Sequence, residues 1–409
     1  MAGVWQSLVN RPSIGISTMV LLTDGSVLCR GDDNTDAGPR QWSRLTPSAG
    51  GTYIDGAWSG VAPSRNARRY YASAVLANGT VLVAGGEKSD GGDDLNAAEL
   101  YDPKTDMWKP LPTPSGWAVI GDAPCCVLAD GRVLLGSIQS TSTAVYDPQR
   151  NSWSPTGNKD DRSSEETWTL LPDGSVLTVE CDNHPKAEKF EPLRNRWVTA
   201  GTLPVDLVQA SSTEIGPAIL MPDGRVFALG ATGHTALYSC PPTPDLPGTW
   251  LAGPDLPLDA HGVQLITKDA PAALLPNGRV LCVTSPLAEG TAAKGYPGPS
   301  YFFEFDGQAF TPIAAPSTGT SPAFAFRFLL LPSGQVLAAN GSSDIEIYTP
   351  DGDPDPVWAP RVVNCPNLVS AGSTYRLQGT QLNGVSQAVS YGDDASMATN
   401  YPLALIHRR

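Results

Sequence analysis

Short apolar runs, each broken by a polar turn that contains glycine, recur along the whole chain. Seven segments share one pattern: two apolar residues, one variable residue, Asp, Asn or Ser, then Gly, one variable residue, Val and another apolar residue. Their glycines are Gly25, Gly79, Gly131, Gly174, Gly224, Gly278 and Gly334. Each segment predicts a β-hairpin, because Asp-Gly and Asn-Gly tolerate the positive φ of a tight turn and branched apolar residues favour strands.

The spacing of these hairpins predicts a repeated fold. Neighbouring glycines are 43 to 56 residues apart, close to the roughly 50 residues of a four-stranded propeller blade of the kelch type. Most hairpins are followed by an apolar run that ends in an aromatic residue, then a polar turn, then Trp. Three such pairs, each seven residues apart, are Tyr101 and Trp108, Tyr146 and Trp153, and Phe190 and Trp197. We expect these aromatic residues to pack between blades, and the fold to be all-β, a seven-bladed β-propeller.

A count of outer strands predicts how the ring closes. Segments with the outer-strand pattern contain Trp5, Trp42, Trp108, Trp153, Trp197, Trp250, Phe310 and, in one reading, Trp358. These are more segments than the seven hairpins need as outer strands, and an unclosed propeller would leave strand edges exposed. We therefore expect the strand around Trp5 to complete the blade that begins at Gly334. The expected domains are a propeller over residues 1–359 and a small sandwich-like segment over 360–409.

Composition narrows the class of protein and its partners. The 41 Gly and 38 Pro among 409 residues argue against an α-rich fold. A net charge of −14 repels phosphate backbones and anionic membranes, so we expect neither nucleic acid nor a membrane as partner. The first residues lack a basic start and an apolar stretch, which predicts a soluble cytoplasmic protein, although a secreted chain with its leader removed would look the same. Seven cysteines without a CxxC pair predict buried free thiols.

The hairpin and AELYDP-type segments resemble the kelch propellers of the galactose oxidase and glyoxal oxidase-like family. The tail GTQLNGVSQAVSYGDDASMATNYPL is similar to the opening of the immunoglobulin-like C-terminal domain of bacterial members. The resemblance implies that 360–409 is an immunoglobulin-like segment, complete or incomplete.

Oxidases of this family use one copper ion, a tyrosine cross-linked to a cysteine, a Tyr-His pair and a histidine from the C-terminal domain. Tyr70, in Ala67-Arg68-Arg69-Tyr70, matches the cross-linked tyrosine. Ile16 and Ser17 stand where the cysteine is expected, and Phe324-Ala325 where Tyr-His is expected; the nearby His407 matches no motif. Phenylalanine and alanine cannot ligate copper, so we expect neither copper nor copper-radical oxidation.

Equal offsets from the hairpin glycines mark equal heights along the propeller axis. Tyr70 lies nine residues before Gly79, and at or beside the same offset in other blades the chain carries mainly acidic residues. The expected ligand-binding residues at this end are Arg69, Tyr70, Asp122, Glu165, Glu166, Glu214, Asp269 and Phe324. Carboxylates also cap strand starts, so each acid alone has a structural alternative. The Gly-, Ala- and Pro-rich segment 285–301 could cover this end or simply decorate it.

Three of the four histidines fall in loops expected at the same end: His184, His234 and His261. Imidazole with carboxylates suits a divalent metal such as zinc, iron or manganese, or general acid–base chemistry. No HxH or HExxH spacing supports the metal, and polar residues also gather in loops by chance.

Two functions stay open. One is a binding module with an acidic, aromatic-edged axial pocket for a small molecule, a glycan (carbohydrate binding by stacking on aromatic rings) or a protein loop. The other is a non-copper enzyme, a lyase or hydrolase, that uses these histidines and carboxylates with or without a divalent metal. The sequence alone does not decide whether the protein is an enzyme.

Overall fold

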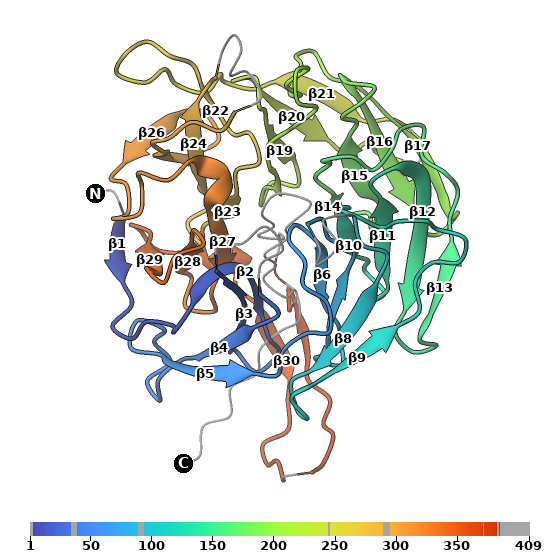
Figure 1. Ribbon diagram of the computed structural model, residues 1–409, viewed down its shortest axis with the longest axis vertical. Coiled ribbons are helices and arrows are strands. Elements are labelled where there is room, and N and C mark those ends of the chain that lie inside the picture. Colours follow the sequence, from blue (N-terminus) through green and yellow to red (C-terminus); the bar gives the residue numbers. More distant parts are fainter. Residues whose placement is uncertain are drawn as a thin grey trace.

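Seven antiparallel sheets follow one another along the chain and stand in a ring around one axis, as Figure 1 shows. The all-β, seven-bladed propeller predicted from the hairpin repeat is therefore confirmed. The computed structural model describes residues 3–33, 39–88, 94–243, 246–288, 295–370, 372–382 and 384. Over these ranges no helix has the length and apolar character needed to span a membrane.

Each blade runs from an inner strand at the axis to an outer strand at the rim. Blade 1 consists of β2 (Gly15–Leu21), β3 (Val27–Asp32), β4 (Trp42–Thr46) and β5 (Ala57–Val61). Blade 2 consists of β6 (Ala72–Val75), β7 (Val81–Ala84), β8 (Ala98–Asp102) and β9 (Met107–Leu111). Blade 3 consists of β10 (Cys125–Val127), β11 (Val133–Ser137), β12 (Ser140–Asp147) and β13 (Ser152–Pro155). Blade 4 consists of β14 (Thr169–Leu170), β15 (Val176–Val179), β16 (Lys186–Glu191) and β17 (Arg196–Thr202).

The last three blades follow the same order. Blade 5 consists of β18 (Ala218–Leu220), β19 (Val226–Leu229), β20 (Thr235–Ser239) and β21 (Thr249–Ala252). Blade 6 consists of β23 (Ala272–Leu274), β24 (Val280–Pro286), β25 (Tyr301–Phe305) and β26 (Phe310–Ile313), and β22 (Leu265–Ile266) pairs with the far end of β24. Blade 7 consists of β27 (Arg327–Leu330), β28 (Val336–Ala339), β29 (Glu346–Thr349) and β1 (Val4–Ser7).

The seven glycine turns share one geometry. Their glycines have φ between 79° and 86°, a region that strains any residue with a Cβ. In each turn the glycine N–H donates to the carbonyl three residues earlier, as Gly25 does to Leu22. The preceding Asp or Asn accepts from the backbone N–H two residues on, as Asp24 does from Ser26, which explains the preference for these residue types.

The N-terminal strand lies at the rim of the last blade. β1 pairs with β29 in the register Trp5 opposite Tyr348, and Figure 1 places the two strands side by side. The Trp5 ring packs on Tyr348 at 4.9 Å and on Phe302 of the neighbouring blade at 5.5 Å between centroids. This strand covers the edge that β29 would otherwise expose.

Trp358 lies outside the blades, so its reading as an outer-strand residue is wrong. It ends the 3-10 turn η3 (Pro356–Trp358) and covers Gly278, where an added Cβ would come within 2.4 Å of the indole ring. Beyond it, β30 (Arg361–Asn364) pairs with β31 (Gln378–Thr380). Most of the expected immunoglobulin-like segment, with His407, lies outside the described residues.

The hydrophobic core lies between adjacent blades. Each buried cluster combines two neighbouring sheets, as where Leu82 of blade 2 packs with Leu135 of blade 3. The three aromatic–Trp pairs are cross-strand neighbours within their blades, with ring centroids 5.0 to 5.4 Å apart. Each pair also packs in a cluster shared with the preceding blade, which confirms the predicted packing between blades. All seven cysteines are free thiols and five are buried, but Cys240 is partly exposed and Cys365 is exposed, which corrects the expectation for those two.

Candidate functional site

The residues at the shared offset lie where the inner strands begin, at the end of the propeller that we call the axial mouth. Three of them, Tyr70, Glu165 and Asp269, have nearly the same left-handed backbone, with φ of 47° to 49°. Such a conformation costs a residue with a side chain on the order of 1 kcal/mol. Its recurrence in blades 2, 4 and 6 shows that one backbone turn presents these side chains.

Charged and aromatic groups surround Tyr70. Arg69 binds Asp32 of blade 1 through two hydrogen bonds of 2.9 and 2.8 Å. The Tyr70 ring has the Lys88 ammonium at 5.3 Å and the Arg327 guanidinium at 5.9 Å from its centroid, both within cation–π range. Arg69, one of the expected ligand-binding residues, is thus paired with Asp32 of the neighbouring blade.

Tyr296 joins three blades at the mouth. Its hydroxyl contacts Glu214 Oε1 of blade 5 at 3.0 Å and Asp269 Oδ2 of blade 6. Its ring lies 4.5 Å from the ring of Phe324 of blade 7, and the Lys268 ammonium lies 4.1 Å from its centroid. Burial, followed by the two carboxylates, raises the pKa of the Tyr296 hydroxyl well above its usual value, so the phenol keeps its proton.

Arg327 connects the residues around Tyr296 with those around Tyr70. Its guanidinium donates to the carbonyls of Phe324 and Phe326 at 2.5 and 2.8 Å while facing the Tyr70 ring. Glu214, Asp269 and Phe324 are thus linked through Tyr296, and Phe324 and Tyr70 through Arg327.

Glu165 and Asp122 occupy the remaining part of the mouth. The carbonyl of Glu165 accepts from the Cys181 thiol at 3.5 Å. Burial, followed by the charges of Glu166, Glu165 and Glu214, raises the pKa of that thiol well above its usual value. Asp122 is only 7 % exposed. It therefore offers a ligand less surface than the partly exposed Glu165, Glu214 and Asp269.

Glu166 does not face the mouth, which corrects its expected place in a ligand-binding set. Its side chain is fully buried and binds the Lys159 ammonium at 2.7 and 2.9 Å. It also accepts from the Trp168 indole at 3.0 Å. Its carboxylate is therefore committed to this buried ion pair, whereas Glu165 is partly exposed. Trp168, with Tyr71 and Phe326, is likewise buried in the core.

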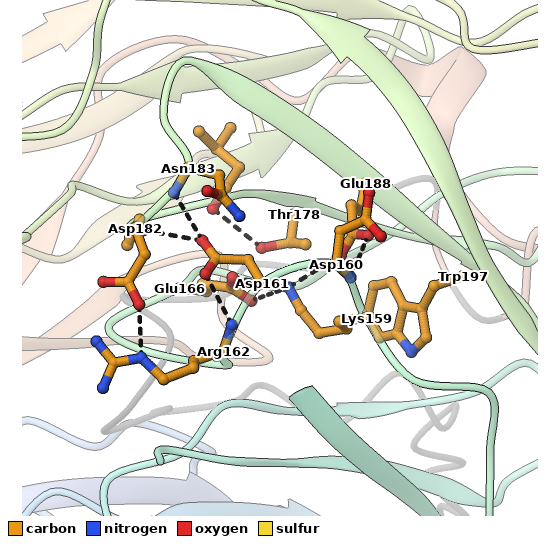
Figure 2. A network of polar contacts seen from close by, with 12 residues as sticks. Lys159, Asp160, Asp161, Arg162, Glu166, Thr178, Asp182, Asn183, Glu188 and Trp197 are labelled. Carbon is orange, nitrogen blue, oxygen red and sulfur yellow. Dashed lines mark hydrogen bonds and ion pairs between the residues drawn. The ribbon is translucent and has the colours of Figure 1, made fainter. Parts of the chain in front are cut away.

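A buried polar network around Lys159 fixes the loop that enters blade 4 (Figure 2). Lys159 also lies 3.3 Å from Glu188 Oε2, and its ammonium is 5.1 Å from the Trp197 centroid. Asp161 accepts the backbone N–H groups of Asp182 and Asn183 at 2.8 and 2.9 Å, as Figure 2 shows. The loop that enters blade 4 is thereby tied to the loop that follows β15.

This network holds more carboxylates than cations. Burial raises the pKa of Glu166 to about 7 despite the neighbouring Lys159. Burial, then repulsion by Glu188, raises the pKa of Glu180 to about 7 as well. Burial lowers the pKa of Lys159, but Glu166 and Glu188 outweigh it and the net direction is upward. Lys159 therefore stays charged.

The three histidines do not meet in one site. His184 Nδ1 contacts Asp206 at 2.6 Å and His234 Nδ1 contacts Asp255 at 2.8 Å. His261 is exposed, and its backbone N–H donates to Asp259 at 2.8 Å. No group of three or more His, Cys, Asp or Glu side chains suited to a metal occurs in the part of the chain that the structure describes.

The sequence analysis missed Tyr296, Lys268 and Arg327. Lys268 and Arg327 each lie within two residues of the shared offset, so reading the flanking positions would have found them. Tyr296 belongs to the segment between β24 and β25, a connection that is short in most other blades and comparably long only between β7 and β8. Only its position as the single aromatic residue of a Gly- and Pro-rich stretch before Tyr301 marks it.

Comparison with known proteins supports the repeat and the fold. Residues 68–115 match the kelch motif. The chain is 24% identical to Kelch-like protein 23 of Mus musculus over 225 residues, which cover 42% of this chain and 38% of the mouse protein. It is 35% identical to the F-box/kelch-repeat protein SKIP20 of Arabidopsis thaliana over 104 residues, which cover 24% of each chain. The chain thus spans less than half the length of these relatives.

A solved structure with the same fold is a fungal alcohol oxidase of the AA5 family in complex with copper. It superposes with a TM-score of 0.63 over 98% of this chain and 93% of its own, at 15% identity. This protein therefore has a kelch motif and a seven-bladed propeller with a galactose oxidase-like structural neighbour. At this identity the likeness concerns the fold alone.

Proposed function

We propose that this protein is a binding module whose axial mouth takes up a loop of a protein partner. The observation that carries the proposal is the linked group at the mouth, in which Tyr296 joins Glu214, Asp269 and Phe324 and Arg327 joins Phe324 to Tyr70. Side chains of blades 2, 5, 6 and 7 are thus linked at one end of the axis.

The residue types of this surface favour a protein partner. Tyrosine, phenylalanine and arginine are enriched at protein interfaces and dominate binding energy there. The mouth supplies the partly exposed rings of Tyr70, Tyr296 and Phe324, with the carboxylates of Glu214 and Asp269 and the exposed Lys88 beside them. The side chains of Arg327 and Lys268 lie buried behind these rings. Charges of both signs give a partner loop several places for complementary contacts.

We also propose that this mouth does not carry copper-radical chemistry. Of the positions that match the family motif, only Tyr70 has a donor atom of the required kind. The buried Ile16 and the Phe324-Ala325 pair offer none, and the Ser17 hydroxyl accepts from Arg30 at 3.0 Å. The Tyr70 ring is flanked by two cationic groups, which would repel a cupric ion.

Selection from a library of displayed peptide loops tests the proposal. The wild-type protein is the target, and the selected loops are then measured against Glu214→Gln/Asp269→Asn. A matched control is Asp130→Asn/Asp223→Asn, which removes the same charge from exposed hairpin turns at the opposite end of blades 3 and 5. We expect loops that lose about tenfold or more in affinity on the mouth variant and keep it on the control, since buried interface charges contribute at least about 1.4 kcal/mol.

Two results would contradict this function. One is a set of loops that bind both double variants equally well, which would place the binding surface elsewhere. The other is an absence of selected loops together with a rise in melting temperature on adding an oligosaccharide, which would make the ligand a glycan. Both double variants are first compared with the wild type by circular dichroism, so that misfolding is not read as lost binding.

A further inference from the structure

Tyr296 fills a place at the mouth that suits a different group better than it suits a phenol. The hydroxyl contacts carboxylate oxygens from two blades, Glu214 Oε1 and Asp269 Oδ2. A phenol has one proton to donate, so it can satisfy only one of these oxygens at a time. The second oxygen of Asp269, Oδ1, is buried and lacks a hydrogen-bond partner among the described residues.

Side-chain contacts, rather than backbone pairing, hold Tyr296 in place. Residues 295–299 make no backbone–backbone hydrogen bond with any described residue, whereas Ser300 is fixed by bonds to Gly319 and Ser321. Tyr296 is half-buried, and Gly295, Gly298 and Pro299 are exposed. Moving the phenol away would therefore break its two polar contacts and its ring contacts without disrupting a sheet.

The surroundings of the phenol match a planar cation. A guanidinium carries five N–H donors in a fixed plane, enough to satisfy two carboxylates at once, and its face stacks on aromatic rings. Asp269 and Glu214 supply the carboxylates, and Phe324 supplies a ring 4.5 Å from the Tyr296 ring. An ammonium group has three donors and no flat face, so it fits this combination less well.

We infer that Tyr296 is an internal occupant of the mouth, and that an arginine side chain of the bound partner loop displaces its hydroxyl from Glu214 and Asp269. The inference rests on the proposed function, because the arginine belongs to the loop that the mouth binds. In the free protein Tyr296 then occupies the site itself. The free energy needed to move Tyr296 makes binding of a partner weaker. Partners without an arginine at the right place cannot offset this cost.

Fluorine NMR on protein labelled with 3-fluorotyrosine tests the inference without a partner. The Tyr296 resonance is identified by its absence from the spectrum of Tyr296→Phe, and the exposed Tyr375 provides a reference signal. We expect propylguanidinium to shift the Tyr296 resonance saturably and to leave Tyr375 unchanged. Propanol should shift neither resonance, and Glu214→Gln/Asp269→Asn should abolish the response.

The loops selected on the wild type provide a second readout. Loops that bind at the mouth should contain arginine and bind Tyr296→Phe about threefold to tenfold more tightly, because no hydroxyl contact has to break. Tyr375→Phe should leave their affinity unchanged. A Tyr296 resonance that ignores saturating propylguanidinium, or equal or weaker binding to Tyr296→Phe, would overturn the inference.

The two proposals fail in different ways. Loop binding at the mouth without any response of Tyr296 to guanidinium contradicts the inference and leaves the proposed function standing. A guanidinium response with no loop bound at the mouth contradicts the proposed function and leaves only a guanidinium site there.

Discussion

Lys159 shows how one buried side chain supports the mouth without facing it. It lies between Glu166 and Glu188, inside the loop that positions Glu165 (Figure 2). A buried ion pair is weak evidence of net stabilisation, but removing one partner leaves an uncompensated charge in a medium of low polarity. Lys159 is therefore important because its loss would leave the buried carboxylates of Glu166 and Glu188 without a cation.

Replacing Lys159 with methionine should destabilise the protein by about 3–5 kcal/mol, since two buried carboxylates lose their cation. The free energy of unfolding in urea measures this. Lys104→Met, at an exposed turn, is the matched control and should change stability by no more than about 0.5 kcal/mol. If both variants changed the free energy of unfolding equally, the buried network would not stabilise the protein more than an exposed lysine does.

Glu180 predicts an unusual dependence of stability on pH. Its pKa in the folded protein is about 7, against an ordinary 4.5. A carboxyl with a raised folded-state pKa penalises folding when it is ionised, so the penalty is fully present above pH 7 and absent below about pH 4.5. Glu180→Gln should therefore raise the melting temperature at pH 8 and change it little at pH 5.

The comparison uses the difference in melting temperature between variant and wild type, which removes the contribution of all other groups. Asp353→Asn, an exposed carboxylate outside the blades, should show no such change of the difference with pH. If Glu180→Gln gave the same difference at pH 5 and pH 8, the carboxyl would not be titrating between them.

Among the elements, β1 is the one on which ring closure depends. It is joined to the propeller by its pairing with β29 and by Trp5, whose indole donates to Ala314 at 2.9 Å. The other outer strands continue directly from their own blade, so a loss of packing leaves them tethered at both ends. β1 does not continue from β29, because the chain connects it to β2 of blade 1, so only pairing and packing hold it to blade 7.

Trp5→Ala should therefore release β1 locally as well as lower stability by about 3 kcal/mol. Hydrogen exchange should become faster in β1 and in the strand edge of β29, with the inner strands unaffected. Trp153→Ala is the matched variant, because Trp153 packs on Tyr146 at 5.1 Å and donates to Pro112 in the same way. It should lower stability without loosening β1, and equal protection of β1 in both variants would argue against this role.

At the scale of the whole molecule, the repeat could be predicted and the site only in part. Gly25 and its six equivalents specify each hairpin locally, so the blades follow from short-range turn chemistry. The shared offset then located Tyr70, Glu165 and Asp269 at equal heights. It could not tell Glu165 from Glu166, because a single residue of register decides which one faces the axis and which one binds Lys159.

Tyr296 lay beyond prediction for a different reason. Its partners, Glu214, Asp269 and Phe324, come from three blades and from positions up to 82 residues away in sequence. No periodicity relates a loop residue to such partners, since the sequence of this loop is not repeated in the other blades. The pairing of Arg69 with Asp32 is a similar case, because it joins blades 1 and 2 through residues 37 positions apart in sequence.

Site-specific photocrosslinking of a selected loop locates the partner-binding surface on the protein. Benzoylphenylalanine is placed at Tyr70, at the mouth, and in a second protein at Leu193, which is fully exposed in the turn between β16 and β17. The account predicts a crosslink to the loop from position 70 and none from position 193. Crosslinking from position 193, with none from position 70, would contradict a partner-binding surface at the axis.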